Sequence, residues 1–215
     1  MLQINNLTGF GVAPSGGGGL TLTHISTTNS TGSTITIPVD SRVSGHLAVL
    51  YQYSRKSGSA PSAITPSGFT NIITSTGSTS RGLCGMKILD GTETSLSGMS
   101  ASADAKHLFI YSGGFASVAA FDAAAQETSG NPASQTVNAT TSDGTKPVLI
   151  VGAAHATNGA NFTIYSPSAD QSSSTGEGTA AVKAYQIGDV LFDHVIDMGD
   201  NGNRNHLMSC YLELS

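Results

Sequence analysis

Short runs in which apolar and polar residues alternate are the feature that most restricts how this chain can fold. Such alternation marks residues 20–25 ("LTLTHI") and residues 33–39 ("STITIPV"), and the "TGS" between them is typical of a turn. A longer apolar run at residues 46–54 ("HLAVLYQYS") indicates a buried strand. Three further runs, bounded by Gly, Ser and Thr turns, predict strands: "GFTNIIT", "RGLCGMKIL" and "KHLFIYSG".

The second half of the chain loosely repeats the order of the first half. "KPVLIVGAAH" resembles "GHLAVLYQYS", "NFTIYSP" resembles "GFTNIIT", "GTAAVKAYQIG" resembles "RGLCGMKILDG", and "HLMSCYLELS" resembles "HLFIYSGG". We interpret the repeat as two sets of strands that face each other across one core, with strands from both halves interleaved. No Pro-rich or charged linker divides the chain, so we expect one sandwich rather than two separate domains.

The fold prediction is therefore all-β: a jelly-roll-like antiparallel β-sandwich of about eight or more strands, with a short N-terminal arm. Residues 1–19 are expected to form the arm and a Gly-rich hinge, and residues 20–215 a single β-sandwich domain. One segment is ambiguous, at residues 116–126 ("ASVAAFDAAAQ"). Alanine favours a helix, but the segment is short and uncapped, so we expect a strand and a loop there.

Four consecutive glycines, Gly16, Gly17, Gly18 and Gly19, precede the first alternating run. A phosphate-binding loop needs a lysine and a helix after its glycines, and the sequence predicts neither here. We therefore interpret the tract as a hinge or a sharp corner. The arm before it carries four apolar residues that either fold back on the core or bind a neighbouring subunit: Leu2, Ile4, Leu7 and Phe10.

The chain is sparsely charged, with 11% charged residues against a usual share of about 25%. Its nine Lys and Arg residues are scattered and its net charge is −5, which argues against nucleic-acid binding. No run approaches the ~20 apolar residues of a membrane span, and the N-terminus lacks the basic start and apolar region of a signal peptide. We expect a soluble protein made in a cytoplasm, with no nucleic-acid partner and no membrane partner.

The two cysteines, Cys84 and Cys210, each lie within an apolar run, "GLCGMKIL" and "HLMSCYLEL". Because free cysteine is among the most buried residue types, we expect two buried free thiols. A disulfide between them stays an open alternative that their spacing does not support.

Motifs for catalysis and for metal binding are incomplete. The nearest match to the Gly-x-Ser-x-Gly of hydrolases is "GMSAS" at residues 98–102, which lacks the second glycine. The segment "DHVIDMGDNGNRN" offers Asp193, Asp197 and Asp200 as weak candidates for a cation site, but their spacing does not match a calcium loop. His194 has no neighbouring His or Cys partner for a transition metal. We therefore predict no catalytic residue, no metal and no cofactor.

Aromatic residues that could bind a sugar are few. Trp is absent, and Tyr51 and Tyr53 share one face of their predicted strand. Such tyrosines are more often core residues or cross-strand partners than a sugar-binding shelf. A carbohydrate-binding role is thereby weakened.

Six segments in this order resemble a family of virion-associated proteins of tailed bacteriophages: "TGFGVAPSGGGGLTL", "STITIPVDSRVSGHLAVLYQYS", "TPSGFTNI", "STSRGLCGMKILDGTETSLSG", "NPASQTV" and "KPVLIVGAA". The family carries an "I-P…G-D-L-AVL" strand, a "P-S-G-W-T" turn and a "YKIL…G" strand in the same order. The resemblance covers residues 8–153 and is weaker beyond. Phe69 stands where the family usually has Trp, and Gly45-His46 stands where Gly-Asp is usual.

The resemblance implies a place in the phage particle. We therefore expect a non-enzymatic structural protein of the virion, made in the host cytoplasm and exposed on the particle as a capsid decoration protein or a tail or fibre component. Its partners would be copies of itself and other virion proteins, contacted through the arm and through faces of low charge. The alternative is a host-surface or glycan-binding module at a fibre or tail tip.

Overall fold

The alternating runs of the sequence become strands throughout the part of the chain that the structure describes. The computed structural model describes residues 20–98, 103–128, 133–155, 162–198 and 205–215. Within these residues the only helical elements are two short 3-10 turns, η1 (Val39–Ser41) and η2 (Ala139–Thr141). The prediction of an all-β antiparallel sandwich is confirmed.

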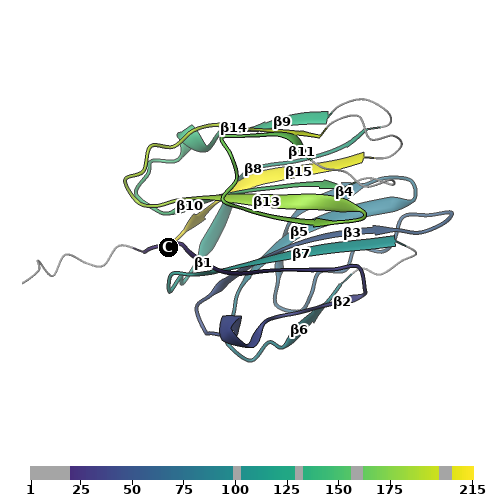
Figure 1. Cartoon of the computed structure of the whole chain (residues 1–215), viewed down its shortest axis with the longest axis horizontal. Coiled ribbons are helices and arrows are strands. Elements are labelled where there is room, and N and C mark those ends of the chain that lie inside the picture. Colours follow the sequence, from purple (N-terminus) through teal and green to yellow (C-terminus); the bar gives the residue numbers. More distant parts are fainter. Residues whose placement is uncertain (1–19, 99–102, 129–132, 156–161, 199–204) are drawn as a thin grey trace, which may run out of the picture.

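Two five-stranded antiparallel sheets form the body of the molecule (Figure 1). The first sheet has the order β1 (Thr23–Ser30), β7 (Ala103–Ser112), β3 (Leu47–Arg55), β5 (Ser80–Ile88) and β4 (Thr70–Thr76). The second sheet has the order β12 (Gln171–Thr175), β13 (Gly178–Tyr185), β10 (Val148–His155), β15 (Asn205–Leu214) and β8 (Val118–Thr128).

The central core lies between the two sheets and is built from alternate residues of each strand. From β3 it receives Leu47, Val49 and Tyr51, and from β10 it receives Leu149 and Val151, all of them buried. Because successive side chains of a strand point to opposite faces of the sheet, the residues between these lie on the outer faces. Both sheets thus contribute to one shared core.

A further layer covers the outer face of each sheet, as Figure 1 shows. The pair β2 (Thr34–Thr36) and β6 (Ser95–Ser97) packs over the first sheet. The three strands β11 (Phe162–Ser166), β14 (His194–Met198) and β9 (Ala133–Val137) pack over the second sheet. Consequently β3 and β10 are buried on both faces, which explains their uninterrupted apolar sequences.

The two halves of the chain have the same topology. In strand order, β1, β7, β3, β5 and β4 of the first sheet correspond to β8, β15, β10, β13 and β12 of the second. The outer strands β2 and β6 likewise correspond to β9 and β14, and η1 and η2 follow β2 and β9. The predicted facing of two strand sets across one core is confirmed.

Two details of the predicted repeat are wrong. Strands from the two halves are not interleaved, because each five-stranded sheet comes from one half alone. Pairing within a half closes shorter stretches of chain than pairing between halves, and shorter closure costs less entropy. The segment "NFTIYSP" forms β11 in the outer layer, so β12 rather than β11 takes the place that β4 has in the first half.

The ambiguous alanine-rich segment forms the edge strand β8, as expected from its lack of a helix cap. A bulge interrupts its pairing with β15 between Ser209 and Tyr211. Asp122 adopts a left-handed backbone conformation on β8 with φ of 49°. Its carboxylate Oδ2 accepts hydrogen bonds from the backbone N–H (2.7 Å) and the Nδ2 (2.9 Å) of Asn138, which ties the edge strand to the start of η2.

The strands give the sandwich two distinct ends. At one end, here called the C-terminal end, β3 and β10 begin and β7 and β15 finish, and the C-terminus lies there (Figure 1). At the opposite end, here called the distal end, β3 and β10 finish and β7 and β15 begin. Polar groups gather inside the distal end, and exposed apolar groups gather at the C-terminal end.

Candidate functional site

Three buried histidines lie between the sheets towards the distal end. They are His107 on β7, His155 on β10 and His206 on β15, together called the histidine cluster, and each is 0% exposed. The ring centroids of His107 and His155 are 5.3 Å apart. Tyr53 of β3 stacks on His155 at 5.4 Å with ring planes only 2° apart, and its ring lies 5.6 Å from that of His206. The cluster therefore joins both sheets through ring contacts.

The hydrogen bonding of the three rings differs. His206 is held between two serine hydroxyls, with Ser75 Oγ 2.6 Å from Nδ1 and Ser80 Oγ 2.7 Å from Nε2. Nδ1 of His107 lies 3.0 Å from Ser173 Oγ. Among the described residues, neither ring nitrogen of His155 has a hydrogen-bond partner. Within the described part of the chain, His155 is thus a buried polar ring that makes ring contacts but no hydrogen bond.

Burial sets the charge of the cluster. Desolvation lowers the pKa of His107 and of His206 to about 4, and lowers the pKa of His155 well below its usual value. The neighbouring rings lower the pKa of His155 further. All three imidazoles are therefore neutral at pH 7, and the cluster can respond to acid by destabilising the sandwich.

Charged groups on the outer face of the first sheet, at the same end, are used within the fold. Ser54 Oγ donates to Asp104 Oδ1 at 2.5 Å, and Lys106 Nζ lies 3.9 Å from Asp104 Oδ2. Lys106 Nζ also donates to the carbonyl of Gly32 at 2.6 Å. The buried ammonium thereby fastens the turn between β1 and β2 to the sheet.

Two surface pockets are each lined by at least two charged residues. One, of about 270 Å³, is lined by Arg55, Lys56, Ser57, Gly58 and Thr79 beside the distal end. Another, of about 370 Å³, is lined by Pro66, Ser67, Lys87, Asp90, Thr92, Glu93, Ser95, Leu96 and Ser97. The ammonium of Lys87 pairs with both carboxylates in the larger pocket, so one of the two negative charges there is neutralised.

The acidic candidates for a cation site have separate surroundings. Asp193 Oδ1 accepts hydrogen bonds from the backbone N–H (3.1 Å) and Oγ1 (2.6 Å) of Thr140, which fastens it to η2. Asp197 lies on β14, and Asp200 is outside the described residues. His194 is buried, with its Nε2 2.8 Å from the hydroxyl of Tyr185. In the described part of the chain, no three His, Cys, Asp or Glu side chains form a group suited to a metal ion.

The predicted arm and hinge lie outside the described residues: Leu2, Ile4, Leu7, Phe10, Gly16, Gly17, Gly18 and Gly19. The first described residues, from Leu20 onward, are firmly held. Leu20 and Leu22 pack against the central core. The side-chain amide of Gln186 then pairs with the backbone of Leu22, accepting from its N–H and donating to its carbonyl, each at 2.9 Å. Leu22 is thus fastened to the loop that begins at Gln186.

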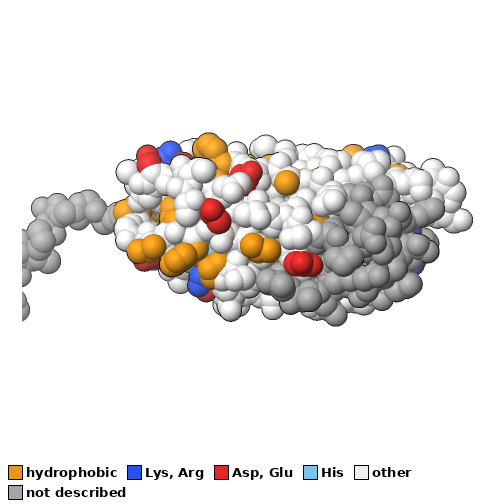
Figure 2. All heavy atoms as spheres, turned by 90° about the horizontal axis from the view of Figure 1, so that it is seen from above, with side chains coloured by type: hydrophobic (Ala, Val, Ile, Leu, Met, Phe, Trp, Pro, Cys, Tyr) orange, Lys and Arg blue, Asp and Glu red, His pale blue; other side chains and the backbone are white. Residues whose placement is uncertain are grey.

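That loop, residues 186–193 between β13 and β14, exposes apolar side chains and is here called the apolar loop. Ile187, Val190 and Phe192 are 44%, 72% and 52% exposed. Asp189 Oδ2 accepts from the backbone N–H of Gln186 at 2.7 Å, while Leu191 packs against the outer core. Figure 2 shows hydrophobic side chains gathered towards the C-terminal end of this face. The loop is held in shape while its apolar groups face outward.

Tyr51 and Tyr53 are both 0% exposed, so the expectation that they are core residues is confirmed. The expectation of two buried free thiols is also confirmed, because Cys84 and Cys210 are both buried and unbridged. A sugar-binding shelf built on these tyrosines would need side chains that solvent reaches.

Comparison with known proteins gives no relative: no family model, no curated protein and no solved structure matches the chain. Nothing in these comparisons links the chain to the phage family that its segments resemble. The helical segments among the described residues are too short to cross a lipid bilayer.

Sequence reasoning missed both the histidine cluster and the apolar loop. Each histidine of the cluster begins or ends an apolar run, as in "KHLFI", "IVGAAH" and "NHLMSC", and this was the available signal. For the apolar loop the signal is the run "VLF" between two aspartates, in a place where the first half has "GTETS". Neither signal states which side chains meet, because that depends on how the two sheets face each other.

Proposed function

We propose that the chain is a non-enzymatic structural subunit of a bacteriophage particle, exposed on the particle as a capsid decoration protein or a tail or fibre component. The observation that carries the proposal is the apolar loop, which is fastened to Leu22 through Gln186. The phage particle itself enters through the resemblance of the sequence segments.

The apolar loop has the properties of a contact surface. Its two aspartates, Asp189 and Asp193, each accept a hydrogen bond from a backbone N–H of the chain itself, which holds the loop in shape. Val190 and Phe192 remain more than half exposed although the loop is held at both ends. Burying such a rigid apolar patch loses little side-chain or loop entropy, which favours association.

The arm is the second contact surface of the proposal. Leu22, which follows these residues in the chain, is hydrogen-bonded to Gln186 at the start of the apolar loop. The apolar residues of 1–19 include Leu2, Ile4, Leu7 and Phe10. A stable subunit contact buries on the order of 1,000 Å² or more in total. The arm and the apolar loop acting together would supply more of that area than either alone, and repetition of the contact in a symmetric particle would strengthen it.

The proposal is tested by protein mass spectrometry of phage particles separated into heads and tails. We expect the full-length chain in one of the two fractions. A chain that lacks residues 1–19 should keep its β-sheet signal in circular dichroism and be lost from the particles. Absence of the full-length chain from both fractions would overturn the proposal, and normal incorporation of the shortened chain would remove the arm from it.

The apolar loop is tested by the double substitution Val190→Ser and Phe192→Ser in the full-length chain. We expect incorporation into particles to fall at least about tenfold, with an unchanged melting temperature, because both side chains contact solvent in the isolated subunit. Ile64→Ser is the matched control, since Ile64 is also exposed (47%) but lies on the long connection between β3 and β4. Equal incorporation of the loop variant and the control would show that the loop makes no contact.

A further inference from the structure

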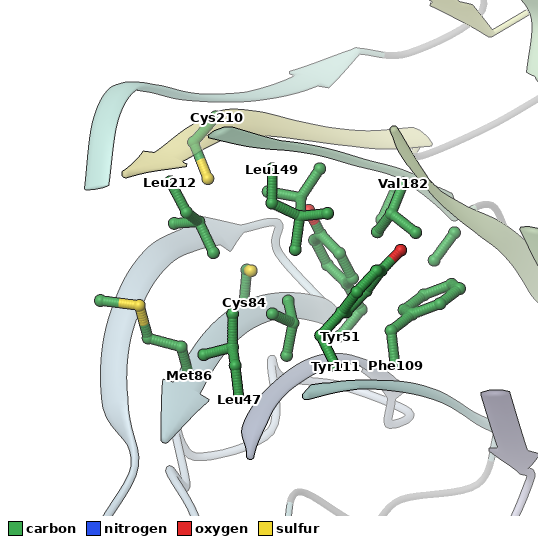
Figure 3. Close-up of a cluster of buried hydrophobic side chains, with 14 of the residues drawn as sticks. Leu47, Tyr51, Cys84, Met86, Phe109, Tyr111, Leu149, Val182, Cys210 and Leu212 are labelled. Atoms are coloured by element: carbon green, nitrogen blue, oxygen red, sulfur yellow. The ribbon is translucent and has the colours of Figure 1, made fainter. Parts of the chain in front are cut away.

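The two cysteines of the chain lie on facing strands of different sheets. Cys84 is on β5 of the first sheet and Cys210 is on β15 of the second. Both are 0% exposed and both belong to the central core. Figure 3 shows the two sulfur atoms on opposite sides of the gap between the sheets, each pointing towards the other sheet.

The register of the two strands brings these residues together. A Cβ on Gly82 of β5 would lie 2.8 Å from Cε of Met208 on β15, so Gly82 and Met208 touch across the core. Inward-facing residues recur every second position, and both strands run from the distal end to the C-terminal end. The next facing pair is therefore Cys84 and Cys210. The two thiols interact directly, because the Cys84 side chain lies within hydrogen-bond reach of the Cys210 thiol.

We propose that Cys84 and Cys210 form a disulfide site that links the two sheets when the protein is exposed to a disulfide oxidant such as oxidised glutathione. The chain contains no other cysteine, so the pair has no competing partner within one molecule. The site is independent of the proposed role in a particle.

The reaction is a pair of thiol–disulfide exchanges. The thiolate of one cysteine attacks a sulfur of oxidised glutathione, forms a mixed disulfide and releases one glutathione thiolate. The thiolate of the other cysteine then attacks the cysteine sulfur of the mixed disulfide and releases the second glutathione. The two cysteine thiols lose two protons and two electrons in total, and one oxidised glutathione becomes two reduced molecules.

Burial determines when the exchange takes place. Desolvation raises the pKa of the Cys210 thiol well above its usual value, and the nearby Cys84 thiol raises it further. The Cys210 thiolate is therefore scarce in the folded state, and both thiols are buried away from glutathione in solution. The bond is expected to form during folding or opening of the sandwich and to persist once the sheets have closed over it.

The cross-link would constrain the unfolded chain strongly, because it closes a loop of about 125 residues. Disulfides that close long loops raise stability most when the native geometry fits the bond. For a chain of this size the expected rise in melting temperature is roughly 5–10 °C.

The test refolds the full-length chain from denaturant in a glutathione redox buffer and, in parallel, in excess dithiothreitol. We expect the product of the redox buffer to be two hydrogens lighter by intact mass, to have no thiol available to an alkylating reagent in denaturant, and to melt roughly 5–10 °C higher than the reduced form. Cys210→Ala is the control, since it keeps Cys84 and should melt at the same temperature in both buffers.

Four results would overturn the proposal. Two thiols that remain alkylatable after redox refolding would show that the sulfur atoms cannot bond. A stable adduct that is heavier by one or two glutathiones would show that the second exchange fails. A disulfide-linked dimer would show that the cysteines react between molecules. An intramolecular disulfide that leaves the melting temperature unchanged or lowers it would show that the bond does not fit the native sandwich.

Discussion

The two halves of the chain share one strand order, but the loop after β5 in the first half and the loop after β13 in the second half differ in what they expose. After β5, Leu89 is buried, and Glu93 accepts hydrogen bonds from the backbone N–H groups of Asp90 and Gly91, each at 3.1 Å, while it also pairs with Lys87. After β13, the apolar loop is also held by its acidic side chains but exposes apolar groups. The same strand order accommodates a loop with polar side chains and a loop with exposed apolar side chains. The fold therefore does not require the exposed apolar residues of the second half.

The distal end gives a second comparison between the halves. Tyr53 of β3 lies opposite Gly82 of β5, and His155 of β10 lies opposite Gly178 of β13. The two aromatic rings therefore occupy corresponding positions and stack on each other across the core. The halves face each other as two subunits of a symmetric dimer do, with corresponding strands β3 and β10 at the centre of both sheets. A phenol on one side and an imidazole on the other break that symmetry chemically.

Acid should produce the largest loss of stability, because it charges the imidazoles of the histidine cluster. The pKa of histidine is near 6.5 in the unfolded chain, whereas burial holds the pKa of His107 and His206 at about 4 in the folded chain. The unfolded chain therefore binds more protons between these values. The stabilising contribution is complete above pH 6.5 and is lost as the pH falls towards 4, by at most about 3 kcal/mol for each of these two histidines.

Urea unfolding at pH 7.5, 6.5, 5.5 and 4.5 measures this loss, and His155→Phe identifies its source. Phenyl keeps the stack on Tyr53 and removes two ring nitrogens that have no partner among the described residues. We expect the variant to be as stable as the parent at pH 7.5, or about 1 kcal/mol more stable, and to lose less stability in acid. A variant that is clearly less stable at pH 7.5 and equally sensitive to acid would refute this account.

The next largest effect on stability concerns two corresponding glycines, Gly82 in the first half and Gly178 in the second half. A Cβ on Gly178 would lie 2.4 Å from the carbonyl oxygen of Ala154 and 2.4 Å from Cδ2 of His155. A Cβ on Gly82 would meet the flexible end of Met208 instead. Backbone cannot move aside as a thioether can, so we expect Gly178→Ala to cost about 3 kcal/mol and Gly82→Ala about 1 kcal/mol.

Chemical denaturation of the two alanine variants at pH 7.5 gives both free energies of unfolding. The parent protein and Gly58→Ala serve as references; Gly58 has a positive φ of 85° but open space around it, so its cost is conformational only. Equal costs for Gly178→Ala and Gly82→Ala would show that the two halves pack their distal ends alike, against the structure.

Fold class was predictable from this sequence because the alternation of apolar and polar residues within a short run is sufficient to indicate a strand. Runs such as "LTLTHI" and "HLAVLYQYS" contain their own burial pattern, and the repeat of apolar runs indicated two facing strand sets. The partners of each strand were less predictable. The prediction of interleaved halves failed because alternation shows which side of a strand is buried but not which strand lies beside it.

Sites were much less predictable than the fold. The histidine cluster draws His107, His155 and His206 from three strands and both sheets, so it exists only after the sheets have met. The pairing of Cys84 with Cys210 likewise depends on the alignment of β5 with β15, which no local pattern encodes. The sequence showed that Asp193, Asp197 and Asp200 lie in one polar segment. It did not show that Asp193 accepts a hydrogen bond from Thr140 of η2, which is far from it in sequence.

The smallest expected effect concerns the edge strands, which both halves tie to a 3-10 turn. β1 has a bulge between His24 and Ser26, and Ser26 Oγ lies 2.6 Å from Ser41 Oγ in η1. β8 has its own bulge, where Asp122 accepts two hydrogen bonds from Asn138 beside η2. We expect Ser26→Ala to cost about 0.5–1 kcal/mol, because it removes one hydrogen bond between neutral groups.

Asp122→Ala should cost more, about 2 kcal/mol, since it removes two hydrogen bonds to a carboxylate and places alanine at a positive φ. Asp122→Gly separates the two causes: glycine accepts the backbone conformation, so it should lose only the share due to the hydrogen bonds. Urea denaturation of the three variants gives the ranking. If Ser26→Ala proves as costly as Asp122→Ala, the second half does not depend on its edge more than the first half does, and the left-handed Asp122 has no special role in holding η2.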